Sequence, residues 1–137
     1  MANLAINETF SSLGLTGKTK LVVLGSSDEW MDRIRSLQLE HVSPAGILRR
    51  EISRLPSGLG RAESDLIALM RKWFFARKPD AGFLLTDFPA TLLQSKIFDE
   101  WLDSRHEALD AVIAGPGSPA SVVTHYAHHG LLREVIP

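Results

Sequence analysis

The sequence predicts a three-layer α/β domain, in which helices cover a mostly parallel, doubly wound sheet. Three short segments, 20–25, 82–86 and 109–114, are rich in aliphatic residues and lack the alternating polar positions of a half-exposed strand. Strands of this kind are typical of parallel sheets that are buried on both faces. Segments with the apolar spacing of helices alternate with these strands along the chain, which is the order of βαβ units.

The composition fits one globular domain. The chain has 137 residues, of which 45% are hydrophobic, a net charge of −1 and no cysteine. This charge offers no basis for binding nucleic acid or anionic membranes, and the lack of cysteine excludes disulfides and thiolate metal ligands. No apolar run approaches the ~20 residues of a membrane span, and the N-terminus lacks a signal-peptide pattern. We therefore expect a cytoplasmic protein without nucleic-acid or membrane partners.

The first strand follows a polar lead, residues 1–19. It ends in the turn Gly25-Ser26-Ser27-Asp28, in which Ser27 or Asp28 can cap a helix at about 29–38. A short second strand is predicted at 39–42.

Two helices precede the central strand. Ser43 and Pro44 supply the cap and first turn of a helix that ends near residue 55. A second helix, at 62–77, has a wide apolar stripe, so Trp73-Phe74-Phe75 within it is interpreted as core rather than as a stacking platform.

The segment 82–94 is the centre of the predicted sheet and is followed by a helix that starts near Pro89. Because ligands in parallel α/β sheets bind at the carboxyl ends of the strands, we expect a site within 86–94. After the strand at 109–114, a helix is predicted at 120–129. A short strand at 131–136 completes the domain.

The segment Gly82–Gln94 resembles the Gly-Phe-Leu-Leu-Asp-Gly-Phe-Pro-Arg-Thr segment of adenylate kinases and related nucleoside monophosphate kinases. Further similarities occur in the family's order. Leu21–Gly25 resembles the first strand and first phosphate-loop glycine, His41–Arg49 the His-Ile-Ser-Thr-Gly-Asp-Met-Leu-Arg segment, and Val122–Val135 the closing helix and strand. The resemblance implies a P-loop nucleoside-kinase-like core over 20–137.

The resemblance also implies candidate nucleotide-binding residues. Arg49 matches the arginine that holds the acceptor phosphate, and Gln94 matches the glutamine that reads the acceptor adenine. A solvated helix arginine and an ordinary surface glutamine are the alternatives. Asp87 stands one place after the family's metal-orienting aspartate, and its role is left open. The candidates are Gly25, Ser26, Ser27, Arg49, Asp87 and Gln94. Mg²⁺ with ATP or AMP is implied only if nucleotide binding is retained.

Other positions depart from the family. The segment after Gly25 is shorter than the family's phosphate loop, has no lysine, and carries Asp28 and Glu29 where a triphosphate should lie. Thr86 replaces the metal-orienting aspartate, and Ala90 replaces a phosphate-binding arginine. The acceptor arm is shortened, and the chain after Gly115 has no room for a lid. These departures imply a degenerate, minimal member of the family without assigned catalytic residues, a pseudoenzyme with the scaffold of a transferase. Whether the chain is an enzyme is left open.

Three functions stay open at this point. The first is a domain with weak adenine-nucleotide binding or a protein-interaction role. The second is a reduced but active nucleoside monophosphate kinase, in which Lys18, Lys20 or a neighbouring subunit supplies positive charge. The third is a structural, homo-oligomerising module whose exposed apolar residues include Phe74, Phe75 or Trp30.

Histidines cluster on the last predicted helix. His125 and His129 are four residues apart and would share a face, so a third ligand from elsewhere would complete a Zn²⁺ or Ni²⁺ site. No acidic partner is evident in the nearby sequence. We therefore interpret these residues, with His128, as a solvated or partly packed helix face and assign no metal. Asp99, Glu100 and Asp103 are interpreted as a solvated helix face as well.

Overall fold

The computed structural model describes residues 18–25, 39–51 and 63–134. The helix expected at 29–38, most of the polar lead and the segment 52–62 lie outside these residues. The described elements are β1 (Lys20–Leu24), β2 (His41–Val42), α3 (Pro44–Glu51), α4 (Glu63–Ala76), β3 (Phe83–Thr86), α5 (Leu92–Ser104), β4 (Ala111–Ala114), α6 (Ala120–His128) and β5 (Leu132–Glu134).

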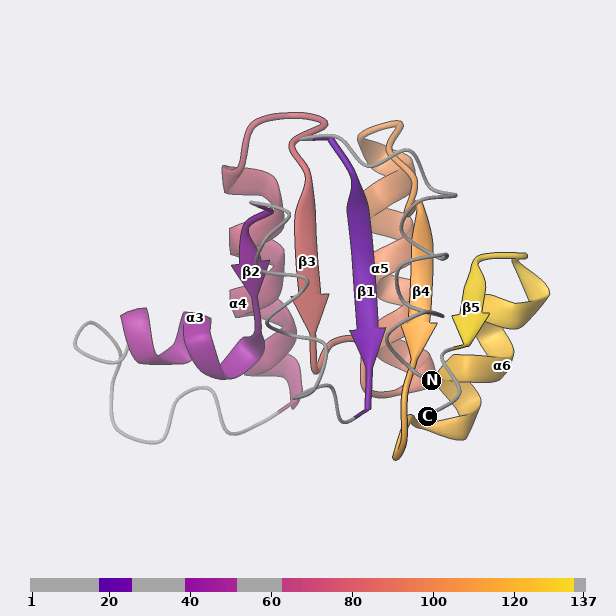
Figure 1. Ribbon diagram of the computed structural model, residues 1–137. Coiled ribbons are helices and arrows are strands. Elements are labelled where there is room, and N and C mark those ends of the chain that lie inside the picture. The colour runs from indigo at the N-terminus through magenta and orange to yellow at the C-terminus, as the bar shows by residue number, and fades with distance from the viewer. Residues whose placement is uncertain (1–17, 26–38, 52–62, 135–137) are drawn as a thin grey trace.

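The five described strands form one sheet in the order β2-β3-β1-β4-β5, and every neighbouring pair is parallel (Figure 1). The predicted α/β class and parallel sheet are therefore confirmed. The strands that follow β1 lie on both sides of it, β2 and β3 on one side and β4 and β5 on the other. This strand order is the one expected of a doubly wound sheet, but the described residues include only one of the two helical layers of the predicted three-layer arrangement.

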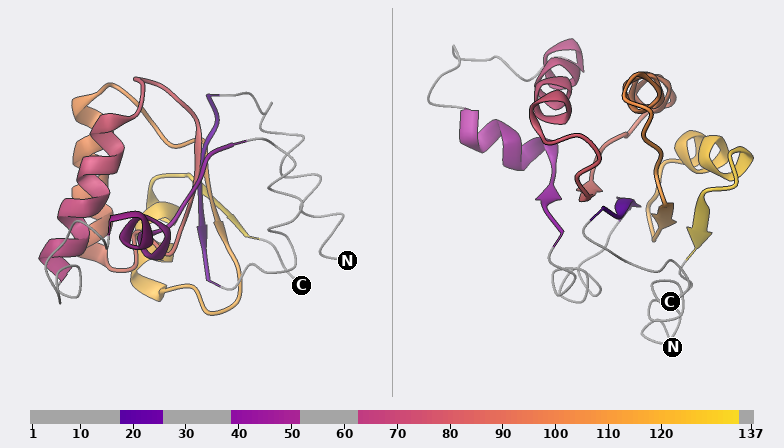
Figure 2. Two further views of the ribbon diagram at one scale, coloured as in Figure 1. Left: turned by 90° about the vertical axis from the view of Figure 1, so that its left-hand side faces the viewer. Right: turned by 90° about the horizontal axis from the view of Figure 1, so that it is seen from above.

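The described helices α3, α4, α5 and α6 all lie on the same face of the sheet (Figure 2). Between them and the sheet, apolar side chains form the core. Phe98 on α5 packs edge-to-face on Phe74 of α4 with ring centres 5.7 Å apart, and Trp101 stacks on Phe88 at 6.0 Å. Phe74, Phe88 and Phe98 are completely buried. Such large rings supply much of the apolar area that a small domain can bury.

The apolar stripe of α4 is only partly in the core. Phe74 is fully buried, which means that its predicted exposure as part of an oligomerising surface is wrong. Phe75, its neighbour, is 38% exposed. Trp73 is half-buried and donates a hydrogen bond from its indole nitrogen to Glu40. Trp30 lies outside the described residues.

Local polar contacts explain where the helices begin and end. The Gly46 amide donates to the Ser43 hydroxyl over 3.1 Å, so Ser43 caps α3 as predicted. Helix α5 begins at Leu92 rather than near Pro89, because Thr91 is its cap and accepts a hydrogen bond from the Gln94 amide. Beyond α6, Gly130 has a φ of 71° and ends the helix in the expected left-handed conformation.

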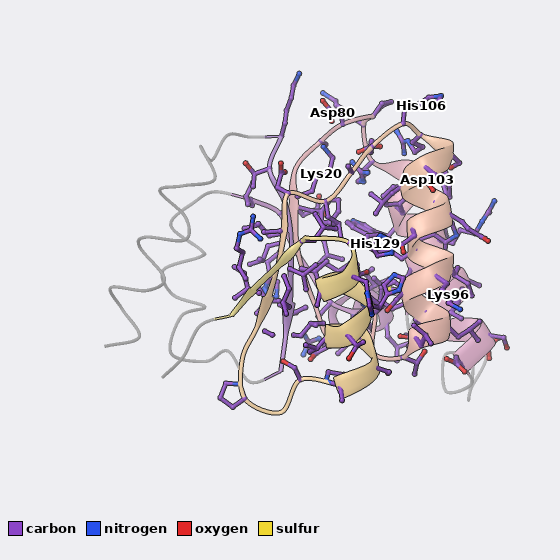
Figure 3. All side chains as sticks on the ribbon, turned by 90° about the vertical axis from the view of Figure 1, so that its right-hand side faces the viewer. Lys20, Asp80, Lys96, Asp103, His106 and His129 are labelled. Carbon is purple, nitrogen blue, oxygen red and sulfur yellow. The ribbon has the colours of Figure 1, made fainter. Side chains whose placement is uncertain are left out.

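A buried lysine and an exposed aspartate form an ion pair at the amino-terminal edge of the sheet. Lys20, at the start of β1, is 4% exposed and binds Asp80 over 2.6 Å (Figure 3). That hydrogen bond, together with the positive charge of Lys20, holds the pKa of Asp80 below its ordinary value. The lysine ammonium also donates to the Lys18 carbonyl. Lys18 and Lys20 therefore both lie at the amino-terminal edge of the sheet.

Candidate functional site

Three strands end side by side at the opposite, carboxyl edge. Val23 of β1 pairs with Thr86 of β3, and Leu24 pairs with Ala114 of β4. Consequently Gly25, Asp87 and Gly115, which follow these strands, lie at the same edge. In doubly wound sheets, this edge beside the first strand is where ligands bind.

Gly25 can only be glycine in this arrangement. Its φ is 77°, and an added Cβ would lie 2.4 Å from the Pro116 carbonyl oxygen and 2.9 Å from the Ser118 hydroxyl. The turn 115–119, which alone joins β4 to α6, therefore packs directly against the end of β1. The Gly115 amide donates to the Leu24 carbonyl over 3.0 Å and fixes that contact. Ser26 and Ser27, the next two candidates, lie outside the described residues.

Asp87 is exposed and has a φ of 62°. A positive φ is uncommon for residues other than glycine, although aspartate and asparagine adopt it more readily than most. The family resembled by this segment has glycine at the position of Asp87. The turn after β3 therefore keeps a backbone conformation suited to glycine while presenting a carboxylate to solvent.

Thr86, at the position of the family's aspartate, is 8% exposed. Its hydroxyl oxygen lies 3.0 Å from Nε2 of His41, which comes from the neighbouring strand β2. A neutral hydroxyl that is hydrogen-bonded to a histidine lacks the negative charge with which a carboxylate orients Mg²⁺ and its waters.

Gln94 is buried, with 4% of its surface exposed, so the interpretation of an ordinary surface glutamine is wrong. Its Oε1 accepts a hydrogen bond from the Ala90 amide over 2.7 Å, and its Nε2 donates to Glu63 over 3.3 Å. The carboxamide thus ties the turn after β3 to the start of α4. One Nε2 hydrogen and one oxygen lone pair are left for other contacts.

Arg49 is exposed on α3, which lies beyond β2 at the level of the carboxyl ends of the strands (Figure 1). The structure thus places Arg49, Gly25 and Asp87 on the carboxyl-edge side, with Gln94 buried beneath the turn. Lys18 and Lys20 lie at the other end of β1. Lys20 is about 13 Å from Leu24, because the strand rises by about 3.3 Å for each of the four residues between these positions. They cannot supply charge to this site, which corrects that part of the active-kinase hypothesis.

Sequence reasoning missed a second polar cluster, between α5 and α6. Asp99 on α5 lies 2.6 Å from Nε2 of His125 on α6, so its interpretation as part of a solvated face is wrong. An acidic partner for the histidines does exist, 26 residues earlier in the chain. Burial, and then the charge of Asp99, raises the pKa of the neighbouring Tyr126 well above its ordinary value. Only the packing of α5 against α6 could have revealed this cluster.

The topology defines a parallel α/β domain, and ligands of such domains bind at the carboxyl ends of the strands. No family model matches the chain. An adenylate kinase from Moorella thermoacetica (strain ATCC 39073 / JCM 9320) is 36% identical over 88 residues, which cover 56% of this chain and 41% of the relative. The similarity supports the adenylate kinase resemblance, although the chain spans less than half the length of that relative. None of the helices in the described residues is long and apolar enough to span a membrane.

Proposed function

We propose that this chain is an adenylate kinase-like domain that has lost efficient phosphoryl transfer and retains weak binding of an adenine nucleotide. The observation that carries the proposal is the carboxyl end of β3. There, the neutral Thr86, hydrogen-bonded to His41, stands where the resembled family has a metal-orienting carboxylate. At Thr86 and Ala90, the described part of this edge therefore lacks two of the groups with which the resembled family stabilises a transferring phosphoryl.

The chemistry of phosphoryl transfer explains why these replacements matter. Catalysis depends on positive groups and Mg²⁺ placed around the transferring phosphoryl. Removing one transition-state donor typically lowers the rate by ~10²–10³. Thr86 stands in place of a metal-orienting carboxylate, and Ala90 in place of a phosphate-binding arginine. The two reductions in rate therefore multiply.

Binding has weaker requirements than catalysis. The exposed Arg49 can donate two parallel hydrogen bonds to a phosphate, and it lies on the side of the carboxyl edge. Gln94 can contact a base only if its buried carboxamide turns away from Ala90 and Glu63. Mg²⁺ would enter only with a nucleotide, held mainly by its phosphates. A carboxylate at Asp87 adds negative charge to the edge, so we expect AMP to bind more readily than ATP.

Calorimetric titration with AMP, ADP and ATP, with and without Mg²⁺, tests the binding half of the proposal. We expect millimolar to high-micromolar affinity for AMP, and a loss of about tenfold in Arg49→Gln. Arg133→Gln is the matched control, because Arg133 is an exposed arginine on β5 at the far end of the sheet. Equal losses in both variants, or no binding at 10 mM AMP (roughly −2.7 kcal/mol), would refute retained binding.

A coupled phosphoryl-transfer assay at high enzyme concentration tests the catalytic half. We expect no turnover above the uncatalysed rate with ATP and AMP. Turnover of about 1 s⁻¹ or faster, within the usual range of kinases, would favour the reduced but active kinase. In that case, a neighbouring subunit is the source of charge that remains of those named in that hypothesis, because Lys18 and Lys20 lie at the opposite edge.

The homo-oligomer or protein-interaction role stays a prediction as well. Leu92 and Leu93, at the start of α5, are 39% and 55% exposed, and Phe75 on α4 is 38% exposed. Sedimentation velocity over a range of concentrations tests self-association. A single monomeric species at every concentration would reject the oligomeric version.

A further inference from the structure

Helices α5 and α6 bring one carboxylate and two imidazoles together. Asp99 comes from the middle of α5, His125 from the last turn of α6, and His129 directly follows that helix. One ligand atom from each of the three residues lies within 4.8 Å of the other two. We propose that Asp99, His125 and His129 form a binding site for a divalent transition-metal ion, with Zn²⁺ as the preferred occupant. This site does not depend on the function proposed for the carboxyl edge.

The donor set suits Zn²⁺. Two histidine nitrogens and one carboxylate oxygen are three of its usual protein ligands, and neither Mg²⁺ nor Ca²⁺ favours imidazole. Bonds of 2.0–2.2 Å in a tetrahedron separate the ligand atoms by about 3.4 Å. The distance of 2.6 Å between Asp99 and Nε2 of His125 must therefore increase by under ~1 Å. A pair of ligand atoms at 4.8 Å, the upper limit within the cluster, must approach by about 1.4 Å.

The side chains that must move are able to do so. His129 is exposed, and the side chain of Asp99 is 30% exposed, so each can rotate into the ion's coordination sphere. The side chain of His125 is only 12% exposed and provides the fixed ligand. The rings of His125 and His129 are already 4.6 Å apart, because four residues separate them at the end of one helix.

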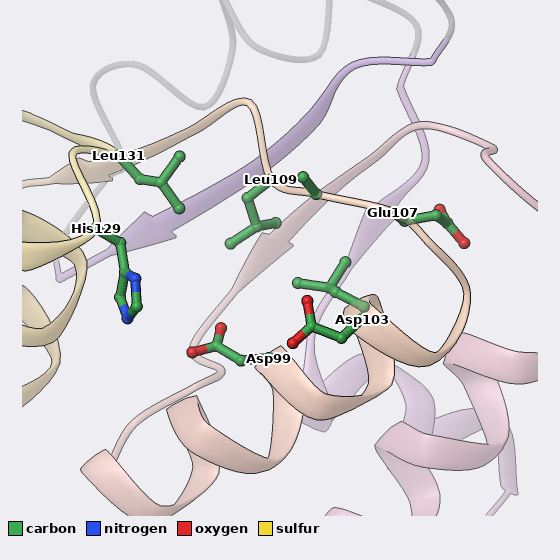
Figure 4. Close-up of a pocket in the computed structure, with 8 residues that line it drawn as sticks. Asp99, Asp103, Glu107, Leu109, His129 and Leu131 are labelled. Atoms are coloured by element: carbon green, nitrogen blue, oxygen red, sulfur yellow. The ribbon is translucent and has the colours of Figure 1, made fainter.

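The site also has an open side. Asp99 and His129 border a cavity of about 240 Å³. Figure 4 shows the His129 ring beside the Asp99 carboxylate, with Asp103 further along α5. Three protein ligands leave a fourth position, which a water molecule can fill from this cavity. The additional carboxylate of Asp103 favours a cation here through its negative charge.

A bound ion would link helices α5 and α6 to each other. Because α5 and α6 are separate crossover helices, a ligand shared between them binds the folded chain and not the unfolded one. Zn²⁺ should therefore raise the melting temperature, and the stabilisation should grow with the logarithm of the Zn²⁺ concentration once that concentration exceeds the Kd.

The test uses the full chain without an affinity tag, stripped of metal with a chelator. Calorimetry should give one Zn²⁺ per chain with a Kd of about 1 μM or tighter, and excess Mg²⁺ should not compete. Co²⁺ should give visible absorption bands of a four-coordinate site. Asp99→Asn and His129→Gln should each weaken Zn²⁺ binding at least about tenfold.

His128→Gln is the matched control. His128 is exposed and adjacent to His129 but outside the cluster, so its replacement should leave the Zn²⁺ affinity unchanged. If Asp99→Asn lowers the melting temperature of the metal-free protein, its weaker Zn²⁺ binding could reflect poorer folding. The test then depends on His129→Gln, because His129 is exposed and lies beyond the helix, so that folding does not need its side chain. Absence of saturable Zn²⁺ binding up to about 1 mM, or equal losses in the His128 and His129 variants, would overturn the proposal.

Discussion

Arg77 donates a hydrogen bond to Glu107 over 2.7 Å, with only 5% and 3% of the two side chains exposed. Glu107 also lies 3.3 Å from Arg105 and 3.8 Å from Lys20. One buried carboxylate thus faces three cations where α4, β1 and the segment before β4 meet. These charges close the amino-terminal edge of the sheet, at the opposite end from the candidate nucleotide site.

The first prediction concerns this carboxylate. Glu107→Gln should lower the free energy of unfolding by about 3–5 kcal/mol, because it leaves the largely buried side chains of Arg77 and Arg105 without their counter-charge. Glu100→Gln, on the exposed face of α5, should change it by less than about 0.5 kcal/mol. Urea unfolding followed by circular dichroism measures both. A cost below about 1 kcal/mol for Glu107→Gln would mean that the cations find other partners.

The second prediction concerns pH. Lys20 holds the pKa of Asp80 below its ordinary value of 3.8. A carboxyl whose pKa is lowered by folding adds stability that is present above its ordinary pKa and lost as the pH falls through the lowered value.

The comparison is between the wild type and Asp80→Asn. Asparagine tolerates the φ of 65° at this residue, so the backbone is kept. The difference in urea midpoint between the two proteins should be constant near pH 6 and shrink steadily as the pH falls below about 4. A difference that does not vary with pH would show that the charge of Asp80 is not what stabilises this edge.

The third prediction uses two glycines with similar backbones. Gly25 and Gly117 have φ values of 77° and 82°, but an added Cβ at Gly117 meets nothing within 4 Å. Gly117→Ala should therefore cost only the strain of its backbone, about 1 kcal/mol. Gly25→Ala should cost at least about 2 kcal/mol more, since the turn after β4 must move as well. If both variants lose the same free energy of unfolding in chemical denaturation, the turn after β4 can move without an energetic cost.

The described part of the fold was predictable because its signals are local. The apolar strand 83–86, the Ser43 cap and the Gly130 stop each depend on a few neighbouring residues, and the structure confirms all three. The site was less predictable. Nothing in the sequence near Gln94 indicates that its amide is hydrogen-bonded to Ala90 and Glu63.

Contacts between distant segments explain the remaining differences. Asp99 and His125 meet only because α5 and α6 pack side by side on the same face of the sheet. The periodicity of either helix alone cannot show this. Similarly, the sequence alone presents Lys20 as a cation that is available to a ligand. In the structure, it is bound to Asp80, which lies 60 residues later in the chain.

The last prediction separates a structural role of Gln94 from a nucleotide-reading one. Gln94→Met keeps a similar volume but removes both the acceptor of the Ala90 amide and the donor to Glu63. The free energy of unfolding should fall by about 1–3 kcal/mol, whereas Lys96→Met on the exposed side of α5 should change it by less than about 0.5 kcal/mol. A preference for AMP over GMP, measured as the ratio of their affinities in the same titration, should change less than about twofold, because most of the amide is already hydrogen-bonded within the protein. If Gln94→Met instead abolishes that preference and leaves stability unchanged, the side chain must swing away from Ala90 to contact the base.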